Sequence, residues 1–168
     1  MIMAVLALTL TANAQKFGYV NTQELFMLMP ELKDVQARMD SLNKQYENLL
    51  MTMQEEFQKK YQDYQQKQQT LPEAMRQKTL PEAMRQIQEE ELASMQQRLQ
   101  TTYQTAQQDV EQKRTEWLKP VNERMAKAIQ DVGAANNYTY IFDSAATVYI
   151  APDADNVMPL VKTKLGIK

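Results

Sequence analysis

Residues 31–69 read ELKDVQARMDSLNKQYENLLMTMQEEFQKKYQDYQQKQQ and contain neither glycine nor proline. Apolar and aromatic residues recur along this segment three or four positions apart, while glutamine and charged residues fill the positions between them. This spacing is typical of a long α-helix with one narrow apolar stripe. Because such a helix is too polar to form a core alone, the stripe predicts a partner helix. The stripe consists of Val35, Met39, Leu42, Tyr46, Leu49, Met53, Phe57, Tyr61 and Tyr64.

The partner is predicted in residues 81–119, which are also 39 residues long and also free of glycine and of internal proline. Two helices of equal length joined by a short break favour an antiparallel coiled-coil hairpin, so we expect residues 31–119 to form one helical arm. At 1.5 Å per residue, each helix would reach about 60 Å. The second stripe consists of Leu92, Met95, Leu99, Tyr103, Ala106 and Val110, with Trp117 one heptad further on.

The break between the helices carries a direct repeat, TLPEAMRQ at residues 70–77 and again at residues 79–86. Each copy begins as a helix N-terminus does, with threonine three residues before glutamate and proline near the start. An insertion of nine residues turns a helix by about half a turn, which would ruin a packed stripe but is harmless at a tip. We therefore expect the tip near residues 70–81. The identical copies fit a recent duplication or an artefact in the sequence equally well.

Residues 1–14 read MIMAVLALTLTANA, an apolar run that ends in small residues. This pattern predicts a cleaved secretory signal peptide, with cutting after Ala14 and export of the mature protein. The run is too short to span a membrane as a helix. Since the chain contains no cysteine, we expect no lipid anchor and no disulfide.

The two ends of the chain, residues 15–30 and 120–168, have a mixed texture and are expected to form a small β-containing body. Residues 17–20 predict a strand, followed by Asn21 as the N-cap of a short helix. A helix should start after Pro120 and end near Gly133, followed by strands at 138–142 and 147–150, a turn at 152–155 and a final helix. So few short strands leave open edges, which symmetric association would close. The candidate residues for that association are Phe17, Tyr19, Val20, Tyr140, Phe142, Val148 and Ile150.

Composition argues against several classes of function. The net charge is −2 with both signs interspersed, whereas nucleic-acid binding needs a concentrated basic face. Histidine is absent, and the sequence shows no catalytic arrangement, glycine-rich phosphate loop or metal-spaced cluster. We therefore expect no enzyme activity, no catalytic residue, no cofactor, no metal and no nucleic-acid partner.

Two segments carry a resemblance to a known family. These are FGYVNTQELFMLMPEL at residues 17–32 and NNYTYIFDSAATVYIAPDADNVMPLVKTKLGIK at residues 136–168. In this order, around a glutamine-rich hairpin, they resemble the Skp/OmpH family of periplasmic chaperones, and the glutamine-rich arms resemble its Bacteroidetes branch. Asn137 stands where that family usually has glycine. The other matching positions are Tyr138, Ile141, Asp143, Tyr149, Pro152, Asp155, Val161 and Leu165.

The resemblance implies an α+β fold that assembles as a jellyfish-shaped homotrimer, with three arms around a cavity that holds an unfolded outer-membrane protein without ATP. Known members are strongly basic, whereas this chain has a pI near 5.3, so electrostatic attraction to clients or to a membrane surface is in question. Flexible apolar side chains beside the stripe suit weak binding of many clients. The candidates are Leu50, Met51, Met75 and Met84.

The alternative function is that of a structural adaptor, which would bridge envelope complexes through the tip of its hairpin. Such adaptors usually carry a second β-domain and often a membrane anchor. The sequence contains neither, which favours the chaperone.

Overall fold

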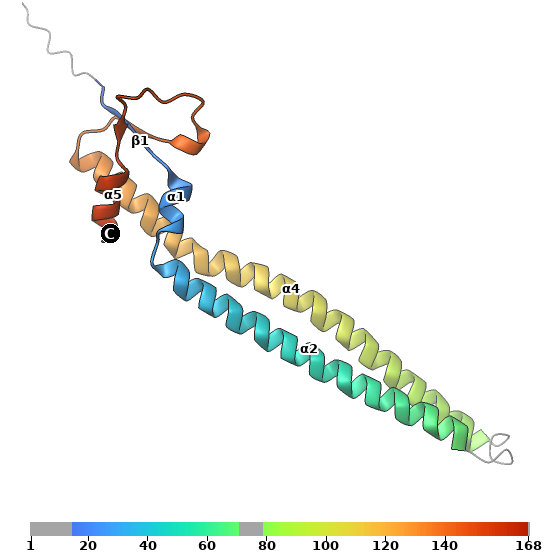
Figure 1. Ribbon diagram of the computed structural model, residues 1–168. Helices are drawn as coiled ribbons and strands as arrows, with labels where there is room; N and C mark the ends of the chain where they lie inside the picture. Colours follow the sequence, from blue (N-terminus) through green and yellow to red (C-terminus); the bar gives the residue numbers. More distant parts are fainter. Residues whose placement is uncertain (1–14, 71–78, 168) are drawn as a thin grey trace, which may run out of the picture. The chain divides into compact units, whose positions relative to one another are not determined.

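The computed structural model describes residues 15–70 and 79–167 (Figure 1). The expected signal peptide and most of the expected tip, including Met75, lie outside the described residues. The described elements belong to two compact units, one formed by residues up to Leu32 and from Lys119 onward, the other by Lys33–Leu118. The expectation of long helices with a small sheet is confirmed. The elements are β1 (Phe17–Val20), α1 (Thr22–Met27), α2 (Glu31–Thr70), α4 (Thr79–Ala135), β2 (Tyr140–Asp143), the 3-10 helix η1 (Ser144–Ala146), β3 (Asp155–Asn156) and α5 (Met158–Leu165).

Within the unit Lys33–Leu118, α2 and α4 lie side by side (Figure 1). Side-chain hydrogen bonds between described residues join the two helices. The Tyr46 hydroxyl donates to Asp109 at 2.9 Å, and the Tyr64 hydroxyl donates to Glu89 at 2.6 Å. The Lys60 ammonium donates to Glu91 at 2.6 Å. As residue numbers rise along α2 they fall along α4, so the two helices run in opposite directions.

The half-buried face of α2 repeats every eleven residues. Val35 is buried, and the side chains that follow it on this face step by four, three and four residues in each repeat. Eleven residues in three turns give 3.67 residues per turn, whereas the expected stripe assumed alternating threes and fours. The face consists of Val35, Met39, Leu42, Tyr46, Leu50, Met53, Phe57, Tyr64 and Gln68, with the more exposed Tyr61 completing the pattern.

The observed faces correct the expected stripe at one position on each helix. Leu49 is 46% exposed, whereas Leu50, which was expected beside the stripe, is half-buried within it. On α4, Tyr103 is 52% exposed, and the polar Thr102 is half-buried in its place. On α2 the face steps by four residues after Tyr46, as a period of 3.67 requires. On α4 the half-buried positions 92, 95, 99, 102 and 106 alternate by three and four residues, which is a period of 3.5.

Helix α4 runs through Pro120, where a new helix was expected to begin. Proline inside a helix removes one backbone hydrogen bond and crowds the preceding turn. The proline ring is exposed, and the apolar neighbours Leu118 and Val121 on either side of it are half-buried and buried. Burial on both sides explains why the helix continues past the expected break.

Helix α4 ends two residues beyond Gly133, at Ala135. Asn137 then adopts a left-handed conformation with φ 56°, and the Tyr138 amide donates to the Gly133 carbonyl at 3.0 Å. Asparagine tolerates this conformation better than other residues with a side chain. Asn137 therefore serves here as the helix C-terminal residue that glycine usually supplies.

The sheet of the other unit is entirely parallel, with the strand order β2-β1-β3. The predicted strand Phe17–Val20 is confirmed and lies in the centre. Gly18 lies close to two neighbours, since a Cβ there would stand 2.8 Å from Val157 and 3.0 Å from the Tyr138 ring. A side chain at this position would push both away.

The expected strand at residues 147–150 is wrong, because these residues have no strand partner and Val148 is fully exposed. The third strand is instead Asp155–Asn156, which begins at the last residue of the segment expected to be a turn. β-Branched and aromatic residues fit a strand only where a partner is available, and β1 has only two edges. The second edge is taken by β3, which leads directly into α5.

The core of this unit lies where α1, α4 and α5 meet the buried face of β1. The largest fully buried side chains are Leu25, Met29, Val20, Val157 and Val161. Leu165 of α5 is also buried, whereas Leu160 of the same helix is 42% exposed. Arg124 of α4 pairs with Glu31 and donates to the Leu165 carbonyl at 3.0 Å, which ties α5 to the rest of the unit.

Candidate functional site

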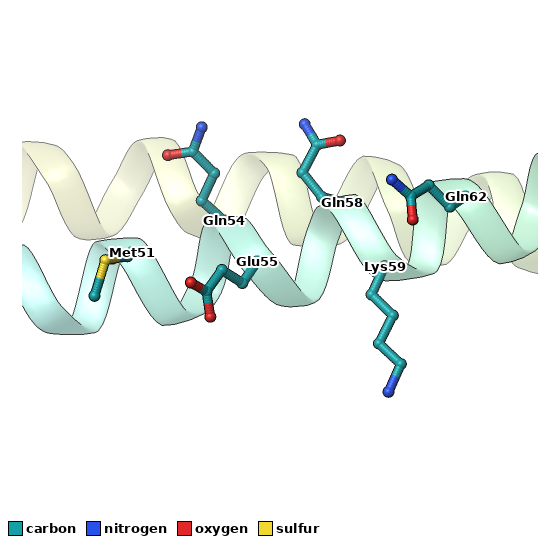
Figure 2. A pocket seen from close by; sticks show the side chains of 6 residues that line it. All are labelled: Met51, Gln54, Glu55, Gln58, Lys59 and Gln62. Atoms are coloured by element: carbon teal, nitrogen blue, oxygen red, sulfur yellow. The ribbon is translucent and has the colours of Figure 1, made fainter.

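A shallow depression of about 400 Å³ lies on the exposed face of α2 (Figure 2). Two rows of side chains border it, each with a spacing of four residues. One row is Met51, Glu55 and Lys59, and the other is Gln54, Gln58 and Gln62. All six side chains are exposed. Residues four apart lie on the same side of a helix, so the rows follow from the helix itself.

The chemistry of this depression suits binding rather than catalysis. It offers one thioether, three neutral amides and two opposite charges, with no nucleophile beside a general base. Within the described part of the chain, none of the six side chains makes an ion pair or a hydrogen bond to another residue. The face is therefore available to an external partner, and its charges balance.

The four predicted client-binding residues do not come together. Met51 is 53% exposed in the depression, whereas Leu50 is half-buried against α4. Met84 is 60% exposed near the start of α4. The bonds between α2 and α4 place Met84 level with the end of α2, far from Met51 along the helices. Met75 lies outside the described residues.

Sequence reasoning missed three exposed apolar side chains. Leu49 and Tyr103 were assigned to the stripe, and Ile87, at 64% exposure, was not singled out. The bonds between the helices place Leu49 and Tyr103 at about the same level, and Ile87 follows Met84 by three residues on α4. Leu49 lies outward because the half-buried face of α2 steps by four residues from Tyr46 to Leu50. Tyr103 lies outward because the face of α4 steps by three residues from Leu99 to Thr102.

In the other unit, three aromatic rings form an exposed cluster on one face of the sheet. The ring centroids of Phe17 and Tyr140 are 6.0 Å apart, and those of Tyr140 and Phe142 are also 6.0 Å apart. Phe17, Tyr140 and Phe142 are 47%, 58% and 50% exposed. Such stacked rings are stable against one another yet leave a large apolar surface in water.

The remaining residues predicted for association lie in different surroundings. Tyr19 alternates on β1 with the buried Gly18 and Val20, so it shares the side of Phe17 and is half-buried. Val20 is 1% exposed and belongs to the core. Val148 lies in the loop before β3 and is fully exposed, and Ile150 in the same loop is half-buried.

Asp143 joins the end of β2 to the start of α1. Its carboxylate accepts hydrogen bonds from the Thr22 hydroxyl, from the Thr22 amide at 3.3 Å and from the Ala145 amide at 3.1 Å. These bonds, the one from the Thr22 side chain above all, favour the ionised form and lower the pKa of Asp143. Asp143 thus caps η1 and the first turn of α1 at once.

We expect Asp143→Asn to lower the free energy of unfolding by about 1 kcal/mol near neutral pH, since an amide replaces a partly exposed charged acceptor. A lowered folded-state pKa stabilises the protein above the ordinary aspartate pKa, and this contribution disappears as pH falls through the folded value. The difference in thermal midpoint between wild type and variant should therefore be constant from about pH 6 to 8 and shrink below about pH 4. A difference that stays constant into strong acid would contradict this role of the carboxylate.

The acidic run at residues 89–91 does not form a metal site. Glu89 accepts the hydrogen bond from Tyr64, and Glu91 accepts the one from Lys60. The bond to Glu89 and, to a smaller extent, burial raise the pKa of the Tyr64 hydroxyl. Among the described residues, no group of three or more acidic, histidine or cysteine side chains could hold a metal ion. Likewise, no described helix is both long enough and apolar enough to cross a membrane.

Comparisons with known proteins agree with this architecture. A family model for outer membrane proteins described as OmpH-like matches residues 16–165. A crystal structure of a candidate OmpH-like outer membrane chaperone from Caulobacter crescentus aligns with a TM-score of 0.71 at 18% sequence identity. The alignment covers 90% of this chain and 83% of that chain, and at this identity it shows a shared fold. A search of curated proteins finds no significant match.

Proposed function

The chain belongs to the OmpH-like family of outer membrane proteins, and we propose that it is an ATP-independent periplasmic chaperone that holds unfolded outer-membrane β-barrel proteins. The observation that carries the proposal is the exposed apolar surface on a helix pair with no catalytic group. Met51, Met84 and Ile87 are each more than half exposed on otherwise polar helices. Flexible thioethers and aliphatic chains bind many partners weakly.

The proposal includes an assembly. In it, α2 and α4 are the two helices of a hairpin arm whose tip lies near residues 70–81, and residues 15–30 and 120–168 form the body. The exposed cluster of Phe17, Tyr140 and Phe142 is the surface through which three bodies associate. Three arms around one axis would enclose a cavity for the client. The fold that this chain shares with the candidate outer membrane chaperone from Caulobacter crescentus supports this arrangement.

The proposed location is the periplasm, reached by cleavage of the apolar leader at residues 1–14. The sequence offers no phosphate-binding loop, so nucleotide hydrolysis cannot drive release. Release would follow from the client folding into a more stable state elsewhere. Each contact must then be weak, which fits a depression that combines amides with one methionine.

The test is aggregation of a denatured outer-membrane β-barrel protein after dilution from urea, measured by light scattering with and without the mature protein from Gln15. We expect suppression without ATP. The client dissociation constant should rise about tenfold when Met51, Met75 and Met84 become serine, because each loses part of its apolar burial. Leu50 is left unchanged, since its half-buried position would confuse binding with stability.

The matched control replaces Lys33, Lys44 and Lys59 with glutamine and should change the dissociation constant less than about threefold. The same small change is expected between about 0.05 and 0.5 M salt, a range that shrinks the screening length severalfold. Lys60 is spared because it pairs with Glu91. A steep loss of affinity with salt, or a larger effect of the lysine variant, would mean that charge dominates binding. No suppression by wild type would refute the function itself.

A further inference from the structure

The amides that border the depression form a regular row. Gln54, Gln58 and Gln62 follow one another at four-residue steps, and the amides of Gln54 and Gln58 point to the side of α2 away from Glu55 and Lys59 (Figure 2). Four residues of α-helix rise about 6 Å. No hydrogen bond joins these three side chains to another described residue, so each amide is free to bind an external group.

The same pattern recurs on the other helix. Five glutamines of α4 lie at four-residue steps and all are exposed. None of them bonds to another described side chain, and the last two border a second depression of about 600 Å³. Both rows belong to the unit Lys33–Leu118, and both lie outside the half-buried faces. The row on α4 is Gln96, Gln100, Gln104, Gln108 and Gln112.

The spacing of these rows matches an extended polypeptide. A strand rises about 3.3 Å per residue, and every second residue turns its N–H and C=O to the same edge, so the repeat at one edge is about 6.6 Å. The mismatch with a 6 Å step is well within the reach of a glutamine side chain, which has three rotatable bonds. A glutamine amide offers two donors and one acceptor, so one side chain can bind both main-chain groups of the residue that faces it.

From this match we infer that the glutamine rows bind the extended main chain of an unfolded polypeptide, with one amide to every second residue. This inference rests on the proposed chaperone function and identifies the part of the client that is bound. Main-chain recognition is independent of client sequence. The row Met51, Glu55 and Lys59 beside the amides adds one apolar contact and no net charge. Each glutamine amide exchanges a hydrogen bond to water for one to a peptide group, so each adds little to the binding free energy. The bound client can therefore still be released.

The experiment compares two fluorescent ten-residue peptides with identical side chains, one of which is methylated at every backbone nitrogen. Their binding to the full-length mature protein is measured by fluorescence anisotropy. Methylation removes the N–H donors without changing the side chains, so we expect it to weaken binding at least about tenfold. Equal affinity for the two peptides, or no detectable binding of the unmodified one, would overturn the inference.

Variants of the protein provide the second arm. We expect Gln54→Ala, Gln58→Ala and Gln62→Ala together to weaken binding of the unmodified peptide severalfold, and the additional changes Gln100→Ala, Gln104→Ala and Gln108→Ala to bring the loss to about tenfold. The combined variant should also lose the discrimination between the two peptides. Alanine has the highest helix propensity, so α2 and α4 are preserved. The matched control is the triple alanine variant of Gln45, Gln97 and Gln107, which are exposed but belong to no such row.

The outcomes separate this inference from the function on which it rests. Should the row variant equal the control in peptide affinity, the glutamines are only a solvated surface. If wild type suppresses client aggregation in that case, the chaperone function stands and only the rows are refuted. Failure of wild type to suppress aggregation, together with intact binding of the unmodified peptide, would refute the function and leave main-chain recognition in place.

Discussion

Removal of eleven residues from each long helix, 50–60 from α2 and 92–102 from α4, should leave the helix pair folded and shift its thermal midpoint only modestly. Eleven residues make close to three whole helical turns, so these deletions bring Tyr61 to the position of Leu50 and Ala106 to that of Met95. Both faces stay aligned along the shortened helices. Circular dichroism during heating of the mature protein measures the midpoint.

The control deletes nine residues from each helix, 50–58 and 94–102. Nine residues turn a helix by about half a turn, so the inward face would point outward beyond the cut. Although fewer residues are removed, we expect the free energy of unfolding to fall by several kcal/mol and the thermal midpoint to fall by roughly 10 °C or more. Equal midpoints for the two designs would show that the helices pack without a fixed period.

Replacement of Phe17, Tyr140 and Phe142 with serine should convert the proposed homotrimer to a single chain at micromolar concentration. The three rings are about half exposed in the single chain. Burying the exposed part of each ring between chains stabilises the contact by about 1 kcal/mol. Their loss would weaken each contact between chains about a hundredfold. Light scattering coupled to size exclusion measures the mass directly.

The matched control for assembly replaces Tyr61 and Tyr103 with serine. These side chains are 41% and 52% exposed and belong to the unit Lys33–Leu118, which does not contain the aromatic cluster. The control should keep the mass of three chains. A wild-type protein that is already a single chain, or a control that dissociates as the triple variant does, would contradict the proposed contact surface.

The parts of the fold that depend on residues close together in the sequence could be predicted. The strand Phe17–Val20 was predicted correctly, and so was the N-cap at Asn21, whose side chain accepts from the Glu24 amide at 2.9 Å. Strong β propensity misled the prediction at residues 147–150, since propensity says nothing about whether a partner strand is available. The all-parallel order β2-β1-β3 depends on pairing between segments more than 120 residues apart, which no local pattern reveals.

The same distinction applies to the residues of the candidate site. Exposure of Met51 could be predicted, because it stands outside any regular apolar spacing. The exchange of Leu49 and Leu50 could not, as periods of 3.5 and 3.67 residues diverge by a single position only after several turns. The aromatic cluster required knowledge of the register, which sets Phe17 opposite Tyr140.

The central place of β1 dictates an order of events during synthesis. Residues 17–20 are synthesised long before the strands on both sides of β1, which end at residues 143 and 156. The helix pair, by contrast, can close as soon as residues up to about 118 are available. A chain that threads N-terminus first through a narrow pore would therefore keep its sheet unformed until residue 156 has crossed.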